Sequence, residues 1–462
     1  MLRAFSSKVK GLRSNPAAVA FLVLLAISSI VRLFAVIHFP PQTSYDTGSY
    51  VHAAHALGKL HLKAYNGFRT PAYPLLLLLG GMNFRVARLI QSILGIVIAS
   101  MLFAITWYRT RSAAASLAVG LLSSLSLSEL LFEQIIYSET LCAFWIVLSA
   151  FAFARTKAPA GTGIRDYALL GLSAALAGMT RPMFLILGPL YFCFIVAEAQ
   201  RLDLSMLREA RLALVLAPTL AVAIGWSAVN QYASNYFGVT TTTGYDLVSH
   251  SGAFIELAPP KYSEIARIYL RYRAPQLRKS GNQAATIWYA GSEIEQTTGF
   301  SGAEVSKQLT RMSLEMFAAH PILYLDSVTR SWLRFWGIGA YGYLGYFKEP
   351  HGRRIFYALV LGMIFLQWGI TLTFLLIAAY SIVRWRQRTS FNYELELIAI
   401  VLLSSIPEAL LINDDNERFF VPLIPLTIYV VVTFLWRAMK PSGARHQQLR
   451  EVKPTVVEIS SH

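Results

Sequence analysis

The chain has 462 residues, of which 55% are hydrophobic and only 14% are charged, and its mean hydropathy is +0.48. Because about a quarter of the residues in soluble proteins are charged, this composition excludes an ordinary soluble protein and favours several membrane spans. The net charge of +16 would suit a nucleic-acid-binding protein. In a membrane protein, however, Lys and Arg collect in cytoplasmic loops, and we favour that explanation. Cys142 and Cys193 lie inside apolar runs and indicate neither a disulfide nor a metal site.

The first apolar run covers residues 17–37 and follows a basic N-terminal lead. It is too long for the core of a cleavable signal peptide, and no small-residue cleavage motif follows it. It therefore predicts a retained first span with the N-terminus inside. Arg32 interrupts this run near its outer end. Two interpretations of Arg32 stay open, namely snorkelling to the lipid headgroups and facing a polar cavity.

Further apolar runs predict spans at residues 84–108, 113–131, 141–154, 167–180, 183–197, 212–229, 355–383, 395–412 and 421–436. Basic segments flank one set of their ends, and the short loops at the opposite ends are acidic. The positive-inside rule then predicts about ten spans with both termini in the cytoplasm. The run 71–82 is too short to span a bilayer, and we predict that it forms a helix in the membrane interface.

The predicted parts are a transmembrane module 1–229 with a catalytic first outer loop 38–83, a periplasmic segment 230–354, a second transmembrane module 355–440, and a disordered cytoplasmic tail 441–462. The periplasmic segment lacks the alternation typical of strands, so we expect mostly short helices. After His320-Pro321, apolar residues recur every three or four positions. This periodicity predicts an amphipathic helix that lies on the membrane.

Ionisable residues concentrate at the ends of the spans that are predicted to lie outside. They come from separate loops and are Asp46, Arg69, Glu139, Arg181, Asp414 and Arg418. Each alone could be a solvated surface charge, but together they predict an active site built on loops over a rigid scaffold. Arg181 joins two short spans and should therefore sit below the outer surface. There it needs an anionic partner or a water-filled cavity, unless it snorkels.

The chemistry available to these residues is limited to carboxylates and cations. The chain contains no HExxH, Walker A, GxGxxG or CxxC motif, which argues against the usual proteases, ATPases and redox enzymes. A carboxylate takes a proton from an attacking hydroxyl or amine, and arginine holds a phosphate leaving group. We therefore predict that Asp46 is a catalytic base. We also predict that Arg69 binds a lipid phosphate that approaches sideways from the bilayer.

Five stretches carry a family resemblance. They are Asp46-x-x-x-Tyr50, Arg69-x-Pro-x-Tyr-Pro, Tyr137-Ser138-Glu139, Thr180-Arg181-Pro182, and the region from Arg418 to Pro425 combined with the helix that ends in Phe335-Trp336. In this order and placement, the chain resembles the GT-C glycosyltransferases. The resemblance is strongest to the bacterial branch related to protein O-mannosyltransferases and the lipid A aminoarabinose transferase (family 39-like).

The resemblance implies an all-α, GT-C-like bundle of about ten transmembrane helices, with interfacial helices in the first outer loop and a large, mostly helical outer segment. It implies inverting transfer of a sugar from a polyprenyl-phosphate-linked donor, with undecaprenyl as carrier, at the periplasmic face of the bacterial inner membrane. The acceptor would be a lipid, glycan or protein. Asp46 would be the base, and Arg69, Arg181 and Arg418 would bind the donor phosphate. The predicted substrate-binding residues are Tyr45, Tyr50, Tyr73, Tyr137, Glu139, Asp414 and Asp415.

The chain also departs from the family pattern. The family often has Asp-Glu in the first loop, whereas Thr47 follows Asp46 here, and Phe68 stands where the aminoarabinose branch has an acid. Because a second acid is missing, we predict no required metal and no cofactor. Two other functions stay open. One is a transporter or flippase of lipid-linked sugars, although neither internal repeats nor mid-membrane charges favour it. The other is a non-catalytic assembly protein whose outer segment is a docking platform.

Overall fold

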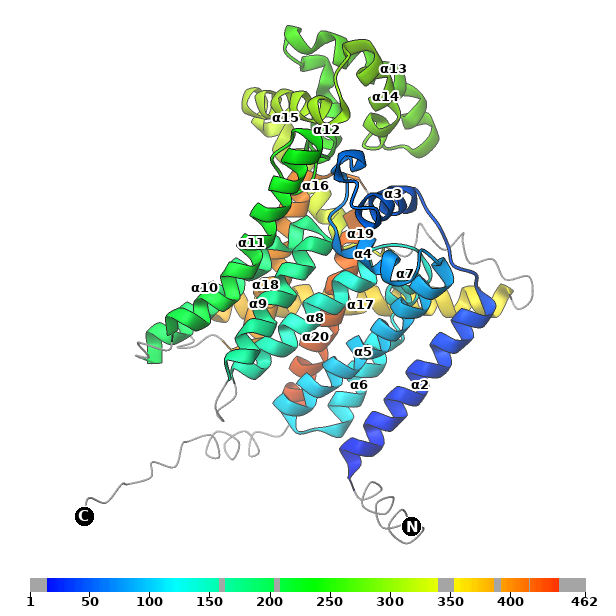
Figure 1. Cartoon of the computed structure of the whole chain (residues 1–462). Coiled ribbons are helices and arrows are strands. Elements are labelled where there is room, and N and C mark those ends of the chain that lie inside the picture. The colour runs from blue at the N-terminus through cyan, green and yellow to red at the C-terminus, as the bar shows by residue number, and fades with distance from the viewer. Residues whose placement is uncertain are drawn as a thin grey trace.

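The computed structural model describes residues 15–157, 163–202, 208–339, 353–385, 392–414 and 416–439. Regular structure in these residues is helical, apart from one isolated parallel bridge between Gln42 and Ile135. Figure 1 shows a bundle of long helices with a cluster of shorter helices, drawn in green, gathered at one end. The all-α polytopic fold predicted from the sequence is therefore confirmed for the described residues.

The helices before the outer segment are α2 Pro16–His38, α3 Thr47–Gly58, η1 Leu62–Ala64, α4 Ala72–Leu79, α5 Phe84–Thr110, α6 Ala113–Ser124, α7 Leu127–Gln134, α8 Glu139–Thr156, α9 Ile164–Thr180, η2 Pro182–Ile186, α10 Leu187–Leu202 and α11 Arg208–Ser234. The outer segment contains α12 Thr243–Ser251, η3 Gly252–Leu257, η4 Pro260–Tyr262, α13 Ser263–Ser280, α14 Thr286–Thr298, α15 Gly302–Ala319 and α16 Pro321–Phe335. The last helices are α17 Arg353–Trp385, α18 Tyr393–Leu411, α19 Asn416–Phe420, η6 Val421–Leu423 and α20 Ile424–Met439.

Side chains that cap the first turns explain where several of these helices begin. Asn15, Asn83 and Ser112 have extended backbones, and their side chains accept hydrogen bonds from the first amides of α2, α5 and α6. Pro182 has the opposite effect at the end of α9. A residue before proline is disfavoured in the helical region, so Arg181 is extended, with φ −145° and ψ 117°, and the helix ends there.

Six described helices are long and apolar enough to cross a membrane, namely Pro16–His38, Phe84–Thr110, Glu139–Thr156, Arg211–Ser234, Ala358–Arg384 and Asn416–Met439. A seventh candidate is the pair α6 and α7, which are bent by 46° against each other. The span predicted at 113–131 is therefore bent after Ser124, and its crossing of the membrane stays a prediction. The helices α9, α10 and α18 do not meet the same length and composition test, so the total of about ten spans stays a prediction.

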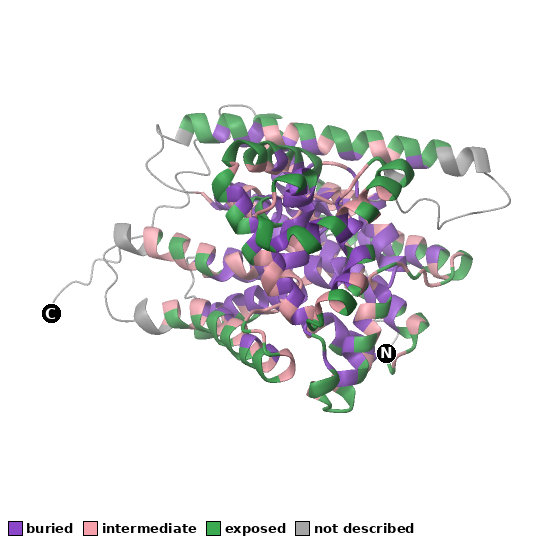
Figure 2. Ribbon diagram, turned by 90° about the horizontal axis from the view of Figure 1, so that it is seen from above, coloured by how far each residue is buried: buried purple, intermediate pink, exposed green. Residues whose placement is uncertain are grey.

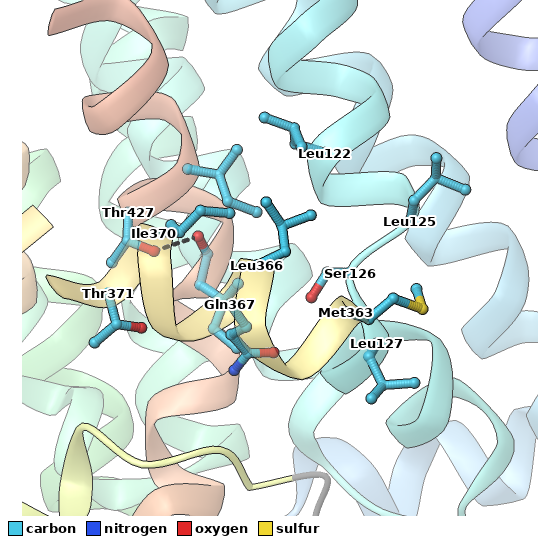
Figure 3. A pocket seen from close by; sticks show the side chains of 12 residues that line it. Leu122, Leu125, Ser126, Leu127, Met363, Leu366, Gln367, Ile370, Thr371 and Thr427 are labelled. Carbon is cyan, nitrogen blue, oxygen red and sulfur yellow. Dashed lines mark hydrogen bonds between the residues drawn. The ribbon is translucent and has the colours of Figure 1, made fainter. Parts of the chain in front are cut away.

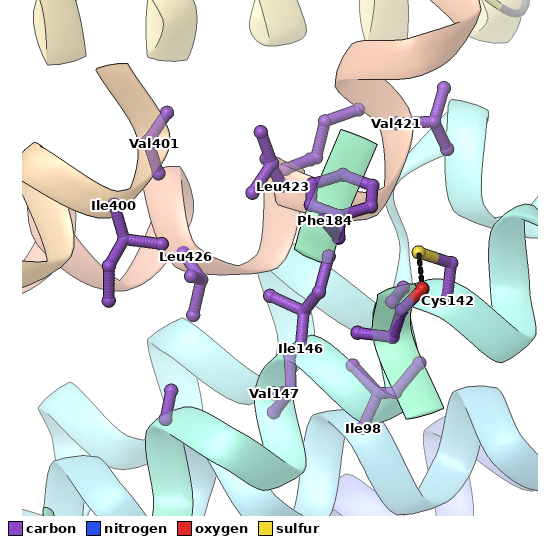
Figure 4. Packing of buried hydrophobic residues seen from close by; sticks show 14 of the residues in the cluster. Ile98, Cys142, Ile146, Val147, Phe184, Ile400, Val401, Val421, Leu423 and Leu426 are labelled. Carbon is purple, nitrogen blue, oxygen red and sulfur yellow. Dashed lines mark hydrogen bonds between the residues drawn. The ribbon is translucent and has the colours of Figure 1, made fainter. Parts of the chain in front are cut away.

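Most of the buried apolar side chains form one core inside the bundle. Figure 4 shows part of it, where Ile146 and Val147 of α8 meet Phe184 of η2 and Leu426 of α20. Figure 2 shows that the buried residues occupy the middle and the exposed residues surround them. Many exposed residues are apolar, such as Phe365 of α17, which is 73% exposed. Apolar surface of this extent is expected where helices face lipid.

The outer segment has a separate hydrophobic core, to which α12, α13, α14 and α15 contribute. It is mostly helical, as predicted. Its last helix, α16, lies against α18, where Trp332 Nε1 donates to Ser405 Oγ at 2.9 Å. This helix buries Ser327 and Ser331 and exposes Ile322 and Leu325, so its outward face is partly apolar. Its predicted position on a membrane surface stays a prediction.

Arg32 is buried inside the bundle, which decides between the two interpretations that the sequence left open. Its guanidinium is 2% exposed and pairs with Glu133 at 2.6 Å, and it also donates to Ser124 Oγ at 2.7 Å. Snorkelling is therefore wrong for Arg32, and Glu133 belongs to the scaffold rather than to a loop tip. Gly95 of α5 makes room for this pair, since an added Cβ would lie 2.0 Å from Glu133 Oε1.

We expect Gly95→Ala to destabilise the purified protein by about 3 kcal/mol, because it pushes apart a buried ion pair. Gly369→Ala in α17 is the matched control, since nothing lies within 4 Å of its added Cβ. The measurement is the melting temperature in detergent. Equal melting temperatures for the two variants would contradict the structural role assigned to the Arg32–Glu133 pair.

Candidate active site

Backbone contacts bring three distant segments together at the end of the bundle that faces the outer segment (Figure 1). The bridge between Gln42 and Ile135 joins the first outer loop to the segment before α8. Thr47 Oγ1 reinforces it by donating to the Ile136 carbonyl at 3.3 Å. Further along, Thr70 Oγ1 donates to the Thr180 carbonyl at 3.3 Å. These contacts place Asp46 beside the start of α8 and Arg69 beside the end of α9.

Five of the predicted residues form a chain of alternating charges, which we call the charge ladder. Arg69 Nη2 lies 2.6 Å from Asp46 Oδ1, and Arg418 Nη2 lies 2.8 Å from Asp46 Oδ2. Arg418 also reaches Glu139, with Nε 2.9 Å from Oε1, and Arg181 Nη2 lies 3.0 Å from the same oxygen. The order is therefore Arg69, Asp46, Arg418, Glu139 and Arg181. The sequence prediction that these loops converge agrees with this geometry.

Hydroxyl groups fix the orientation of the two outermost arginines. Arg69 Nε donates to Ser49 Oγ at 2.7 Å, and its guanidinium carbon lies 4.6 Å from the centre of the Tyr50 ring. Ser138 Oγ accepts from Arg181 Nε at 3.3 Å and shares a hydrogen bond of 2.9 Å with the Tyr50 hydroxyl. Ser138 and Tyr50 thereby connect the two ends of the charge ladder.

Aromatic rings also pack against the guanidinium groups of Arg181 and Arg418. The Phe419 ring lies between Arg181 and Arg418, at 4.3 Å and 5.2 Å from their guanidinium carbons. Tyr137 lies on Arg418 at 4.7 Å. The negative faces of these rings stabilise the cations, and their bulk keeps water away from them. The guanidinium groups are thus held in place in a site of low dielectric constant.

The charge ladder carries three positive and two negative charges, so it has one positive charge in excess. Arg181 is 5% exposed, and its Nη1 makes no hydrogen bond within the described residues. A buried donor without a partner is costly, and an anion relieves both the excess charge and the missing hydrogen bond. The arrangement is therefore suited to binding an anion such as a phosphate.

The arginines of the ladder keep the carboxyl group of Asp46 ionised. Burial alone would raise the pKa of Asp46, but the charges of Arg69, Arg418 and Arg181 outweigh it and hold that pKa well below its usual range. Asp46 is the N-terminal boundary residue of α3, yet its side chain makes no capping hydrogen bond. The carboxylate thus pairs with the arginines instead of capping the helix. It is ionised at neutral pH.

The remaining predicted residues lie at different depths. Tyr50 and Tyr73 are buried and their rings meet edge to face at 4.8 Å, with the Tyr73 hydroxyl donating to Gln91. Tyr45, by contrast, is 88% exposed. Asp414 is half-buried in the loop before α19, and Asp415 lies outside the described residues. Roles in substrate binding for these residues stay predictions.

Sequence reasoning missed two acids near the charge ladder. Asp246, in the first turn of α12, and Glu408 of α18 are both close enough to be influenced by charges of the ladder. Glu408 is 2% exposed and its Oε1 makes no hydrogen bond within the described part of the chain. In the sequence, each of these acids stands out only because the residues around it are uncharged. That pattern does not reveal which groups the acid contacts.

No group of three or more His, Cys, Asp or Glu side chains in the described residues is arranged to hold a metal ion. In the first outer loop, the histidine ring of His52 bonds instead to the Ala64 carbonyl at 3.0 Å. Cys142 and Cys193 are both free. Metal dependence is therefore neither supported nor tested by this arrangement.

No protein-family model matches the sequence, and no curated protein matches it either. Among solved structures, the fold is similar to apo ArnT from Cupriavidus metallidurans, with a TM-score of 0.38 and 14% identity over 90% of this chain and 78% of ArnT. The same protein bound to undecaprenyl phosphate gives a TM-score of 0.38 and 12% identity over 94% of this chain and 81% of that one.

The fold is also similar to the archaeal oligosaccharyltransferase AglB from Archaeoglobus fulgidus, solved with an inhibitory peptide and a dolichol-phosphate. The TM-score is 0.45 with 14% identity, over 95% of this chain and 52% of AglB, so the chain spans about half the length of that protein. All three TM-scores are below 0.5, and the residue roles proposed below rest on the geometry of this chain.

We expect Asp46→Asn to lower the melting temperature at neutral pH, because Arg69 and Arg418 would then repel each other without a shared carboxylate. The folded pKa of Asp46 lies below its unfolded value, so its stabilising effect is complete above about pH 4 and is lost only in stronger acid. The difference in melting temperature between the wild type and the variant, measured by thermal unfolding, should therefore be constant from about pH 5 to pH 8.

Asp326→Asn is the control for this experiment, since Asp326 also pairs with an arginine but is 52% exposed. An exposed pair contributes little, and we expect almost no change in melting temperature for that variant. A gap for Asp46→Asn that closes between pH 7 and pH 5 would contradict the assignment of a lowered pKa.

Proposed function

We propose that this protein is an integral-membrane inverting glycosyltransferase. It moves a sugar from a polyprenyl-phosphate-linked donor to an acceptor at the periplasmic face of a bacterial inner membrane, with both of its termini in the cytoplasm. The observation that carries the proposal is the charge ladder, in which three arginines pair with the carboxylates of Asp46 and Glu139 and leave one excess positive charge.

The arginines form the donor side of the proposed site. Arg69 and Arg418 lie on opposite oxygens of Asp46, and Arg181 has an unused buried donor. A guanidinium offers several N–H groups in one plane, which suits the oxygens of a phosphate. A phosphate that enters here therefore gains hydrogen bonds from three directions and neutralises the excess charge.

A small apolar crevice opens inside the membrane bundle (Figure 3). It lies between the α6–α7 break, α17 and the start of α20, and its lining includes Leu125, Met363 and Ile424. Arg418 lies in α19, directly before η6 and α20, so the crevice and the ladder share one stretch of chain. The crevice is too small to hold an isoprene unit, so in this proposal the lipid chain lies along the apolar outer surface of the bundle while the phosphate reaches the arginines.

The proposed reaction is a single displacement at the anomeric carbon of the donor sugar. The acceptor oxygen or nitrogen attacks this carbon from the side opposite the phosphate, which inverts the configuration. The bond between the anomeric carbon and the phosphate oxygen breaks, and its electron pair stays on the phosphate, where the arginines hold the charge. Asp46 takes the proton from the attacking group.

Donor binding would also prepare Asp46 for this step. With both oxygens paired to arginines, Asp46 holds a proton only weakly and is a poor base. A phosphate competes for the same two guanidinium groups and cancels part of their charge. The pKa of Asp46 then rises toward its usual range, so the base becomes stronger when the donor is in place. Asp46 therefore becomes an effective proton acceptor only after the donor has bound.

We expect Arg69→Gln and Arg418→Gln each to weaken binding of undecaprenyl phosphate by about tenfold or more, since each removes a charge-assisted contact worth about 1.4 kcal/mol or more. Binding can be measured on the protein in nanodiscs. Arg330→Gln is the matched control, because Arg330 is 66% exposed on α16, away from the ladder. Unchanged affinity in both ladder variants would remove the donor site proposed here.

We expect Asp46→Asn to lower sugar transfer by about a hundredfold or more, because the proton has no acceptor. Binding of undecaprenyl phosphate should persist or tighten, since Asn competes less for the arginines. The assay offers labelled undecaprenyl-phosphate sugars and a membrane extract as acceptor to the protein in liposomes. A new glycosidic product identifies a transferase, whereas lipid relocated across the bilayer without product identifies a flippase. Turnover retained in Asp46→Asn would exclude the mechanism.

A further inference from the structure

The outer segment is attached to the first outer loop next to Arg69. Thr241 N donates to the Gly67 carbonyl at 3.0 Å, and Thr241 Oγ1 donates to the Asn66 carbonyl at 2.8 Å. Thr240 Oγ1 adds a hydrogen bond of 3.2 Å to the Phe68 carbonyl. Gly67 has a φ of +76°, and an added Cβ would lie 2.3 Å from Thr241 Cγ2, so only glycine allows this close approach. We call these contacts the threonine latch.

The threonine latch brings the pair Phe68-Arg69 of the first outer loop close to the pair Tyr245-Asp246 of α12. Phe68 precedes Arg69 in the first outer loop, and Tyr245 precedes Asp246 in α12. The rings of Phe68 and Tyr245 are 6.1 Å apart. Because Phe68 and Tyr245 are in contact, the residues that follow them, Arg69 and Asp246, also lie in the same region. The charges of Arg69 and Asp46 accordingly act on the carboxyl group of Asp246.

The same contact builds an aromatic surface beside the charge ladder. Trp288 of α14 stacks on Tyr245 with ring centres 5.1 Å apart and 14° between their planes, and Phe68 meets it edge-on at 6.3 Å. Tyr245 is buried, whereas Trp288 is 45% exposed. A tryptophan held flat by a buried ring, with much of its own surface open, is a rigid platform for another flat or apolar face.

Asp246 follows Tyr245 in α12, the residue on whose ring Trp288 stacks. Thr242 Oγ1 donates to its Oδ2 at 2.8 Å, and its side chain is only partly covered. Burial raises the pKa of Asp246 to about 7, against the lowering effects of Thr242 and Arg69, while Asp46 and Asp414 raise it further. Asp46 and Asp246 are therefore neighbouring carboxyl groups in opposite environments, because arginines contact the first directly and not the second.

An indole face beside a carboxylate is the combination that recognises a sugar ring. The axial C–H groups of a saccharide pack on an aromatic face, and its hydroxyl groups donate hydrogen bonds to a carboxylate. A peptide or a fatty acyl chain lacks the flat C–H face with hydroxyl groups around its rim. The chemistry of Trp288 and Asp246 thus favours a saccharide over either of them.

We propose that α12 and α14 form the acceptor side of the site, where a saccharide stacks on Trp288 and donates one hydroxyl hydrogen bond to Asp246 with its attacking hydroxyl turned toward Asp46. This inference rests on the proposed glycosyltransferase function and specifies its acceptor as a carbohydrate. Asp246 contacts and orients the acceptor, and the proton of the attacking hydroxyl goes to Asp46. The saccharide is either free or carried by a lipid, and both forms present the same ring to Trp288.

The test measures saccharide binding and donor binding on the same proteins in nanodiscs. The variants are Trp288→Ala and Asp246→Ala, and the control is Tyr289→Ala, which removes a neighbouring ring that is 47% exposed. One arm uses an array of free oligosaccharides, and a second uses vesicles that carry polyprenyl-linked oligosaccharides. Undecaprenyl phosphate is the probe for the donor side.

We expect the wild type to bind saccharides in at least one arm, and we expect Trp288→Ala and Asp246→Ala to weaken that binding by about tenfold or more. The control should change it by less than about threefold, and all three variants should bind undecaprenyl phosphate like the wild type. In transfer assays, the two test variants should raise the acceptor KM more than they lower kcat.

Several results would overturn this inference. They are wild-type binding in neither arm, binding that Trp288→Ala leaves unchanged, and transfer to peptides in preference to saccharides. These outcomes leave the proposed function intact if undecaprenyl phosphate still binds and sugar is still released from the donor. A wild-type protein that does not bind undecaprenyl phosphate would instead remove the proposed function itself. The two failures are therefore distinguishable in one set of measurements.

Discussion

The structure of the site depends on the requirement that buried charges be paired. Taking a guanidinium or a carboxylate out of water costs several kcal/mol unless an opposite charge and hydrogen bonds replace the lost hydration. The charge ladder satisfies this requirement with residues that are far apart in the chain, since Asp46 and Arg418 are separated by 372 positions. It also leaves one positive charge in excess among its five residues, which the proposed anionic donor would balance. The same interactions therefore hold the loops together and define the ligand.

The membrane bundle holds the ladder through polar contacts at the ends of its helices. The break between α6 and α7 directs the chain back toward the first outer loop. Gln91 supports that turn by donating to the Phe132, Glu133 and Ile135 carbonyls at 3.3, 2.9 and 2.8 Å. Arg32 and Glu133 fill the interior beside it with a closed ion pair. Buried polar groups inside this bundle thus maintain the loop geometry, because lipid offers them no alternative partners.

The bundle and the outer segment contribute different chemistry to the site. The bundle and its loops supply arginines and a strongly acidic carboxylate, which suit an anionic phosphate. The outer segment supplies an indole face and a carboxyl group whose pKa is about 7, which suit an uncharged, hydroxyl-rich molecule. The threonine latch joins these two halves, and Gly67 allows the close contact because it has no side chain. In the function proposed above, the first half is the donor side and the second is the acceptor side, and a transfer reaction requires that the two meet.

The sequence by itself was sufficient for the helical membrane fold, for most helix positions and for the members of the ladder. Apolar runs and capping residues act over short distances, and ionisable residues at one membrane edge are too costly to be there by chance. The tertiary structure alone decided that Arg32 is buried, that the third predicted span is bent, and that Glu133 is part of the scaffold. It also decided that Asp246 faces the first outer loop. Each of these depends on which partner a residue meets across long separations in the chain, and no local pattern carries that information.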